Sequence, residues 1–335
     1  MRFELTEEQQ AFQDTARDFA ANELAPFAAD WDRDHFFPVE TMRNAAALGF
    51  AGIYVSEDVG GSGLSRLDAA LIFEALSEGC TSTAAFLSIH NMASWMIDTN
   101  GTPEQRERYL PRLATMDLIA SYCLTEPTSG SDAASLRTKA VRDGDHYVLN
   151  GSKVFITNGI HADMVIVCAK TDPKAGAKGI SLFLVDTSLP GFSTGKKIEK
   201  IGQHSSDTAE LFFSDLRVPA DALLGEEGKG FVYLMEELPR ERLGCSTQAV
   251  GAAQGALDLA AAYVQERQAF GQPIAKFQNT RFKLADVKTD IELNLALLEK
   301  NITKFKAGKM TVDDAAVLKL ATTEMQLRAV NECLQ

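Results

Sequence analysis

Paired cysteines, clustered histidines and long apolar runs are all missing from this sequence, and each absence narrows what the chain can be. The five cysteines are scattered, with no Cys-x-x-Cys pair. This argues against a disulfide framework and is typical of a reducing compartment. The five histidines are equally dispersed along the chain, so we expect no metal site. No apolar stretch approaches the roughly 20 residues that a membrane-spanning helix requires.

The chain has fewer basic than acidic residues. The chain has 33 Lys and Arg against 46 Asp and Glu, which gives a formal net charge of −13. Such a surface repels nucleic acid and anionic membranes, and we expect neither as a partner. Apolar residues (45%) and charged residues (24%) occur in the proportions of an ordinary globular protein, and 335 residues allow two or three domains.

Residues 1–120 carry the patterns of helices. Thr6 to Gln9 reads as a capping box, and apolar residues then recur on one helical face. Further helices are predicted over about 38–48, between a glycine-rich loop at 60–63 and Gly79, over about 83–97, and after Thr102. We therefore predict an N-terminal helical domain over 1–120.

Between residues 121 and 230 the period changes to that of strands. Strand-like runs cover 121–125, 138–142, 146–149, 153–157, 164–169, 180–185 and 209–213. Asp143-Gly144 and Asn150-Gly151 lie between such runs and are typical of two-residue hairpin turns. The pattern predicts a middle domain over 121–230, built on an antiparallel sheet or a small barrel.

Residues 231–335 return to long amphipathic helices. They are predicted over about Pro239–Phe270, Phe277–Lys306 and Thr311–Gln335. Helices of this length joined by short loops indicate a bundle. The fold class is therefore α+β, with helical domains on both sides of a β domain. The last helix has no stop signal at Gln335, and we expect the C-terminal bundle to be incomplete at its end.

The most specific segment runs from Tyr122 to Asp132 and reads Tyr-Cys-Leu-Thr-Glu-Pro-Thr-Ser-Gly-Ser-Asp. Taken alone, this Ser/Gly turn after a strand is either a cradle whose amides and hydroxyls bind an anion, or a plain hairpin turn. Together with Asn150–Gly159, Arg267–Gly271 and Gln278, it resembles the acyl-CoA dehydrogenase family in residues, order and spacing. The resemblance covers essentially the whole chain and includes the helix–sheet–helix layout.

This resemblance implies an FAD cofactor. The flavin ring and its pyrophosphate would contact Tyr122, Leu124, Thr125, Gly130, Ser131, Phe155, Ile156 and Thr157. Arg267, Phe270 and Gln278 would reach the FAD of a neighbouring subunit, so the family pattern implies at least a dimer, commonly a dimer of dimers. Without the resemblance, Phe155 reads as plain core and Arg267 as a surface charge.

The resemblance also implies a base. The family reaction removes a proton next to a thioester carbonyl and a hydride from the β-carbon, so it needs a carboxylate across the substrate from the flavin. In the long-chain and isovaleryl branches the glutamate that matches Glu241 has this role, and the matching Arg242 orients the acyl-CoA or tunes the base. Taken alone, a glutamate between Arg240 and Arg242 at a helix start is a solvated ion pair stabilised by the helix dipole.

Contacts with the CoA moiety are implied at Ser131 and Lys178, since lysine suits phosphate, although loop lysines are usually just solvated. Relatives continue past the position of Gln335 into a Gly-Thr-rich loop that donates an N–H to the thioester oxygen. Losing one such donor typically costs about 10²–10³ in rate. We therefore expect weak FAD binding and slow turnover from the chain as it stands.

The substrate and partners follow from the same resemblance. The first 100 residues are similar to isobutyryl-CoA dehydrogenases and the stretch 207–243 to long-chain enzymes, so a short or branched acyl-CoA is slightly favoured. Electrons would pass to an electron-transferring flavoprotein. The alternatives are an acyl-CoA oxidase and a non-catalytic acyl-CoA-binding or assembly protein. No signal peptide is expected, which places the chain in a bacterial cytoplasm or a mitochondrial matrix.

Overall fold

The computed structural model describes residues 5–335. The chain forms two compact units, each made of segments that are far apart in the sequence. The helical unit comprises Met1–Ala29, Arg66–Ala85 and Leu238–Gln335, and the sheet unit comprises Asp30–Ser65 and Phe86–Glu237. The α+β class is confirmed, while the boundaries near residues 120 and 230 stay a prediction.

Helix ends in the chain follow the predicted capping signals. Helix α1 (Glu7–Phe19) starts after Thr6, whose side chain accepts from the Gln9 amide while the Gln9 side chain accepts from the Thr6 amide. The same reciprocal pair starts α6 (Pro103–Ala114) at Thr102 and α9 (Val312–Leu334) at Thr311. Each box satisfies two amides that the first helical turn leaves without partners.

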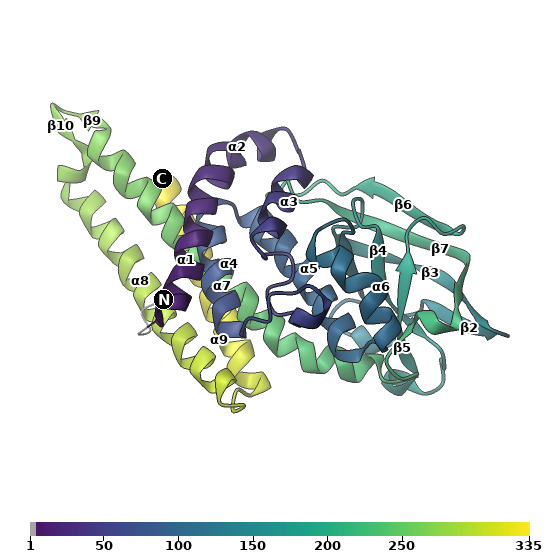
Figure 1. The fold of residues 1–335 in the computed structure, drawn as a ribbon. Coiled ribbons are helices and arrows are strands. Elements are labelled where there is room, and N and C mark those ends of the chain that lie inside the picture. The colour runs from purple at the N-terminus through teal and green to yellow at the C-terminus, as the bar shows by residue number, and fades with distance from the viewer. Residues whose placement is uncertain (1–4) are drawn as a thin grey trace. The chain divides into compact units, whose positions relative to one another are not determined.

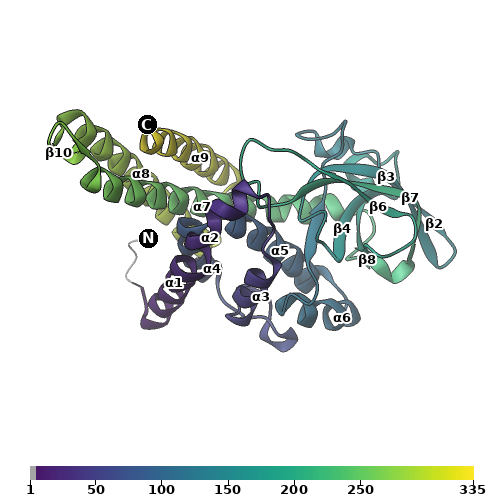
Figure 2. The same cartoon turned by 90° about the horizontal axis from the view of Figure 1, so that it is seen from above.

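The helical unit packs long amphipathic helices around one core. Its helices include α1, α4 (Arg66–Gly79), most of α7 (Gly230–Glu266), α8 (Gln278–Lys306) and α9. On α8 the buried residues are Val287, Ile291, Leu295, Leu298 and Ile302, spaced three or four apart on one face. They pack with apolar residues of α4, α7 and α9. Figure 2 shows α8 and α9 side by side in this unit.

Two predicted ends of α7 are wrong. The helix begins at Gly230 rather than Pro239, and Pro239 lies inside it. A proline costs one backbone hydrogen bond in a helix interior, and this long helix continues on both sides of it. At the other end α7 stops at Glu266, because Phe270 and Gly271 form a left-handed turn (φ 52° and 77°) between β9 (Gln268–Ala269) and β10 (Gln272–Pro273). Figure 1 shows this hairpin joining α7 to α8.

Helices α4 and α7 cross at very short range. A Cβ added to Gly251 would lie 2.3 Å from the carbonyl oxygen of Glu74, and one added to Gly255 would lie 2.8 Å from that of Glu78. Both distances are below any real contact of a Cβ, so these positions require glycine. The contact brings the backbones of the two helices together within the helical unit.

The sheet unit holds one eight-stranded sheet. The strands are β1 (Ala120–Cys123), β2 (Lys139–Asp143), β3 (His146–Thr157), β4 (Met164–Lys170), β5 (Ile180–Asp186), β6 (Phe192–Lys197), β7 (Thr208–Pro219) and β8 (Leu223–Leu224). Their order is β6-β7-β3-β2-β4-β5-β8, and β1 also pairs with β4. Of the predicted antiparallel sheet or small barrel, the sheet is present, but it is mixed, because β1 and β2 both pair with β4 in parallel.

One of the two predicted hairpin turns exists. Asp143-Gly144 ends β2, and Gly144 has the positive φ of 62° that a tight turn requires. Asn150-Gly151 is not a turn, because β3 runs straight through it. At this point β7 carries an extra residue: Asp215 (φ 50°) donates its amide to the Asn150 side chain at 2.9 Å. The Asn-Gly pair therefore faces a β-bulge.

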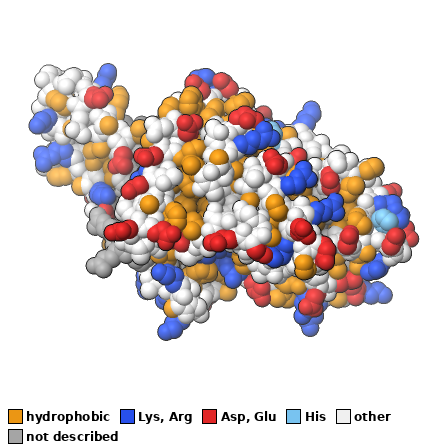
Figure 3. All heavy atoms as spheres, viewed as in Figure 1, with side chains coloured by type: hydrophobic (Ala, Val, Ile, Leu, Met, Phe, Trp, Pro, Cys, Tyr) orange, Lys and Arg blue, Asp and Glu red, His pale blue; other side chains and the backbone are white. Residues whose placement is uncertain are grey.

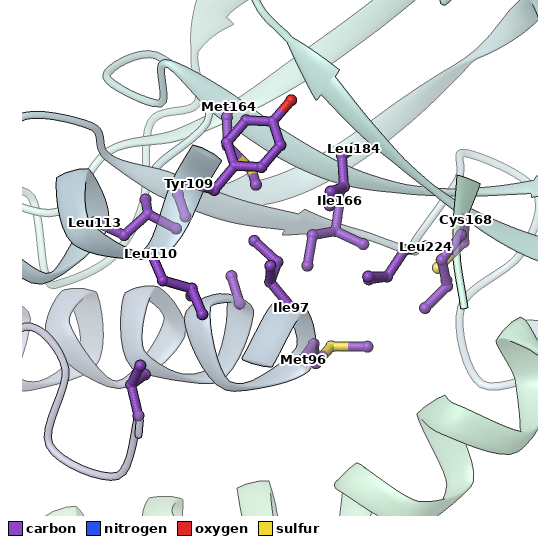
Figure 4. Close-up of a cluster of buried hydrophobic side chains, with 14 of the residues drawn as sticks. Met96, Ile97, Tyr109, Leu110, Leu113, Met164, Ile166, Cys168, Leu184 and Leu224 are labelled. Atoms are coloured by element: carbon purple, nitrogen blue, oxygen red, sulfur yellow. The ribbon is translucent and has the colours of Figure 1, made fainter. Parts of the chain in front are cut away.

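Strand β4 is buried on both faces, which explains its unbroken apolar sequence. Met164, Ile166 and Cys168 face one core, while Val165 and Val167 face the other. The first core also contains residues of α5 (Thr81–Asn100), α6, β5 and β8, as Figure 4 shows. The second lies among β2, β3, β4, β5 and β7.

A fully buried histidine fixes the start of β1. His90 on α5 accepts from the Ala120 amide through Nδ1 (3.1 Å), and its Nε2 contacts the Leu113 carbonyl at 2.9 Å. Burial lowers the pKa of His90 to about 4, so the ring is neutral and carries its proton on Nε2. His90 thereby holds the strand that carries Tyr122.

The exterior carries both signs of charge. Figure 3 shows acidic and basic side chains interspersed over the visible face. None of the helices within residues 5–335 combines the length and the apolar character that crossing a membrane requires.

Candidate cofactor site

The turn after β1 is held by its own backbone. Glu126 and Ser129 exchange amide-to-carbonyl hydrogen bonds of 2.9 and 3.1 Å, and the Ser129 hydroxyl donates to the Asp132 carbonyl at 2.6 Å. Gly130 and Ser131 lie at the exposed side of this turn. The predicted Ser/Gly turn is thus present and presents those two residues outward.

A buried ion pair that sequence reasoning missed lies directly behind the turn. Lys153 of β3 is fully buried and donates from Nζ to Glu126 Oε1 at 2.9 Å, while the Glu126 side chain is 4% exposed. The carboxylate also accepts from the amides of Arg137 (2.6 Å) and Thr138 (2.9 Å). Both charges therefore have hydrogen-bond partners, which is the condition under which a buried pair is tolerated.

The pKa of Glu126 records the same contacts. Burial by itself would raise that pKa, but the charge of Lys153 and the hydrogen bonds from Lys153, Thr138 and Arg137 together hold it below its usual value. The carboxylate therefore stays ionised and maintains its ion pair with Lys153.

The ion pair fastens the segment after β1 to β3. Lys153 Nζ also donates to the Leu124 carbonyl at 3.0 Å, and the Val154 amide donates to the Thr125 carbonyl at 2.9 Å. These bonds bring Leu124 and Thr125 next to the part of β3 that precedes Phe155. The predicted flavin contacts Leu124 and Thr125 are therefore held beside Phe155 by hydrogen bonds to Lys153 and Val154, the two residues that precede it.

Phe155 lies in a second bulge. Lys153 pairs with Leu211 and Ile156 with Ala209, so Val154 and Phe155 together face the single residue Glu210. Phe155 adopts a φ of 60°, and the residue is 64% exposed. A bulky residue in the left-handed region is rare and costly, and such outliers cluster at functional sites. In a regular strand the side chains alternate between the two faces of the sheet. The bulge interrupts this alternation and leaves the Phe155 ring exposed.

The neighbours of Phe155 point in different directions. The side chain of Ile156 packs in the core, so any contact with a cofactor would come from its backbone. Thr157 is half-buried, and its carbonyl accepts from the Ser121 hydroxyl at 2.5 Å. Tyr122 is half-buried, and its hydroxyl accepts from Cys168 at 3.1 Å.

The residues present fit an FAD. A Cβ added to Gly130 would meet nothing within 4 Å, and Gly130 has no positive φ. Neither backbone conformation nor a protein neighbour therefore requires glycine there, whereas a phosphate that approaches the backbone closely would. An exposed aromatic face at Phe155 and half-buried hydroxyls at Thr125 and Thr157 complete a suitable set for a ring and its polar edge.

The two residues predicted to contact CoA within the sheet unit lie on neighbouring segments. Ser131 lies two residues before η3 (Ala133–Ser135), and Lys178 lies in η4 (Gly176–Gly179), which contacts η3. Both side chains are exposed. A hydroxyl and an ammonium are thus available on one part of the surface for a polar ligand.

The predicted FAD contacts of the helical unit gather at one hairpin. Arg267 precedes β9, Phe270 occupies the turn, and Gln278 starts α8. All three are exposed, and Phe270 is 96% exposed with a φ of 52°. The Arg267 carbonyl accepts from Ile274 at 2.9 Å, which closes the hairpin. All three side chains are therefore accessible to another molecule, although the Phe270 ring also makes an edge contact with Phe277.

Glu241 has a different setting from the predicted one. Because α7 starts at Gly230, Glu241 lies in the helix interior and not in its first turn. The amides of the first turn are therefore not beside it, and the expected helix-dipole stabilisation falls away. Glu241 and Arg242 are both half-buried. A second carboxyl, Glu237, is buried one helical turn earlier and was not singled out from the sequence.

Comparisons with known proteins agree with this architecture. Models of the acyl-CoA dehydrogenase N-terminal, middle and C-terminal domains match residues 6–117, 121–216 and 228–335. Mitochondrial isobutyryl-CoA dehydrogenase of Dictyostelium discoideum is 47% identical over 331 residues, which are 99% of this chain and 78% of that protein.

Two solved structures are also similar. Butyryl-CoA dehydrogenase from Megasphaera elsdenii gives a TM-score of 0.94 at 40% identity and covers 100% of this chain and 89% of its own. A chain from a structure of the electron-transferring flavoprotein of Acidaminococcus fermentans gives 0.96 at 40% identity and covers 100% of this chain and 88% of its own.

Proposed function

Because this chain belongs to the acyl-CoA dehydrogenase family, we propose that it uses FAD to convert a short or branched acyl-CoA to its 2-enoyl-CoA. One observation carries the proposal. Hydrogen bonds from Lys153 and Val154, together with the Lys153–Glu126 ion pair, fasten the segment 124–131 to the part of β3 that carries Phe155. When bound, FAD supplies the acceptor for the two electrons that leave the β-carbon.

The chain's residues would hold FAD at three places. Tyr122, Leu124 and Thr125 would line the ring, Phe155 would cover one face, and the Thr157 hydroxyl would lie at its polar edge. Gly130 and Ser131 would receive the pyrophosphate, because the turn has open space at the glycine. The exposed Arg267, Phe270 and Gln278 would reach the cofactor of a second copy, which would make the protein at least a dimer.

Glu241 would hold the abstracted proton. Its carboxylate would take the proton next to the thioester carbonyl. Arg242 beside it would orient the substrate's polar end. Ser131 and Lys178 would contact the CoA arm, where their hydroxyl and ammonium suit phosphate oxygens. The electrons would then pass to an electron-transferring flavoprotein.

Substitution of Glu241 tests the base. Glu241→Gln should keep FAD bound and lower the dehydrogenation rate with an artificial electron acceptor by about 10²–10⁴-fold. Glu236→Gln, an exposed glutamate on the same helix, is the matched control and should leave the rate unchanged. Equal rates for the wild type and Glu241→Gln would remove Glu241 from the mechanism. In that case Glu237→Gln tests the buried carboxyl one turn away.

An anaerobic titration with a panel of acyl-CoAs identifies the substrate. Loss of flavin absorbance on mixing reports reduction, and the acyl chain that gives it fastest is the preferred one. Purified protein without flavin absorbance, even after incubation with FAD, would contradict the proposal and favour an acyl-CoA-binding role. Rapid reoxidation by oxygen alone would instead favour an oxidase.

A further inference from the structure

Two histidines far apart in the sequence are neighbours in the sheet unit. His35 follows α2 (Ala25–Arg33), and His204 lies in the segment between β6 and β7, where their rings stack with centroids 4.5 Å apart. Glu199 lies beside them, with its Oε2 3.8 Å from His35 Nδ1. One ligand atom from each of the three residues lies within 4.8 Å of the other two. The histidines are dispersed along the sequence, but His35 and His204 are neighbours in the folded chain, contrary to the expectation that no histidines cluster.

The backbone around these side chains is clamped. Lys197 Nζ donates to the His35 carbonyl at 2.9 Å and to the His204 carbonyl at 2.8 Å. The His204 amide donates to Asp32 Oδ1 at 2.6 Å. The two segments are thus held together independently of the side chains of His35, Glu199 and His204, which leaves those side chains available for a ligand.

The ring nitrogens are chemically available. Within residues 5–335, no hydrogen bond engages a ring nitrogen of His204, and the contact from His35 Nδ1 to Glu199 is too long for one. His35 and Glu199 are exposed and His204 is half-buried, so solvent and ions reach the group. The two stacked imidazoles and the carboxylate form no hydrogen bond with one another. A cation bound between them would be coordinated by all three side chains.

We propose that His35, Glu199 and His204 bind a transition-metal ion, with zinc as the first choice and water as the remaining ligand. Two imidazoles and one carboxylate form a donor set that zinc takes at about 2.0–2.2 Å. Hard cations such as magnesium and calcium prefer oxygen donors alone, so the set discriminates against them. Bonds of that length require ligand atoms about 3.3–3.5 Å apart, so the three side chains must move by about 1 Å to close on the ion.

The surrounding charge permits a cation. Asp32 and Glu199 contribute two negative charges that balance the positive charges of Lys197 and Lys200, which interacts with both Lys197 and Asp32. A bound ion would connect the end of α2 to the segment that leads into β7. That segment ends at Thr208, which pairs with Thr157 in the β3–β7 ladder. Metal binding would therefore stiffen the segment next to the predicted flavin contact.

Titration of chelator-treated protein with Co²⁺ and Zn²⁺ tests the site. We expect one equivalent of Co²⁺ to give visible absorption bands, Zn²⁺ to displace it, and calorimetry to show the same stoichiometry. His35→Ala and His204→Ala should each weaken binding by about tenfold or more, since even groups behind a metal ligand cost about 10–100-fold. Glu199→Gln should weaken it less.

The matched control is His146→Ala. His146 is another histidine beside a carboxylate, 2.6 Å from Asp145, in the same unit but without a second histidine. It should leave binding unchanged. The proposal is overturned if the wild type binds no tighter than the double variant His35→Ala/His204→Ala, or if His146→Ala removes binding equally. Circular dichroism of each variant confirms that it is folded.

Discussion

The two units present their predicted cofactor residues in opposite ways. In the sheet unit, Thr125 and Phe155 are tied to one another through backbone bonds and a buried Lys153–Glu126 pair. In the helical unit, Arg267, Phe270 and Gln278 stand exposed around one hairpin. The sheet unit therefore anchors its predicted contacts from its own core. The predicted contacts of the helical unit are exposed side chains that are available to another molecule.

Breaking the buried pair should have the largest effect. Lys153→Met leaves the Glu126 carboxylate buried without its cation, which should lower the free energy of unfolding by about 3–5 kcal/mol. Lys283→Met removes a half-exposed pair with Glu332 in the helical unit and should cost less than about 1 kcal/mol. Denaturant unfolding of both variants measures the contrast. Similar values would show that the pair in the sheet unit is no more important than a surface pair.

The helical unit has its own rigid point at the α4–α7 crossing. Gly251→Ala places a Cβ against the Glu74 carbonyl and should destabilise the protein by about 1–3 kcal/mol. Gly244→Ala, on the same helix with nothing within 4 Å, should be neutral or stabilising by up to about 1 kcal/mol. Thermal unfolding separates the two. A Gly251→Ala variant as stable as Gly244→Ala would mean that the helices move apart at no cost.

Each unit exposes one phenylalanine in a left-handed conformation, and the two should respond differently. Phe155→Gly and Phe270→Gly both remove backbone strain and should raise stability by up to about 1 kcal/mol. Phe155→Gly should weaken FAD retention in every oligomeric state. Phe270→Gly should weaken it only where copies associate. Flavin content measured across a dilution series distinguishes the two, and identical behaviour would contradict the division of roles.

The smallest expected effect concerns pH. Burial raises the pKa of Glu78 to about 7, and Glu74 and Asp258 add to the shift while Arg17 opposes it. The folded chain therefore keeps a proton that the unfolded chain releases near 4.5, so this stabilisation is present below pH 4.5 and is lost as pH rises through 7. Glu78→Gln should flatten the dependence, with a midpoint about 2 °C higher at pH 8. Glu126 acts oppositely, because its lowered pKa removes stability as pH falls.

Local patterns in the sequence predicted most of the elements. The predicted capping box at Thr6 is confirmed, and Thr102 and Thr311 form the same box, because its hydrogen bonds join residues only three positions apart. The hairpin turn predicted at Asn150-Gly151 is wrong, because this pair instead faces a bulge at Asp215, which lies far along the chain. The helix start predicted at Pro239 is wrong, because the packing of a long helix outweighs the one hydrogen bond that the proline removes.

The candidate site was predictable only where a family motif carried it. Thr125, Gly130 and Phe155 stand in such motifs, whereas the burial of Lys153 against Glu126 has no local signature. Nor does the meeting of His35 and His204, which depends on how the β6–β7 segment folds back. Long-range contacts of this kind require the three-dimensional structure.

Strand β4 carries one more consequence. It forms ladders with β1, β2 and β5 and divides two apolar cores, so its amides are shielded on every side. Opening it requires the loss of both cores at once. In hydrogen–deuterium exchange, the amides of Val165 to Cys168 should be the last of the sheet unit to take up deuterium, at a rate that reports the global unfolding of that unit.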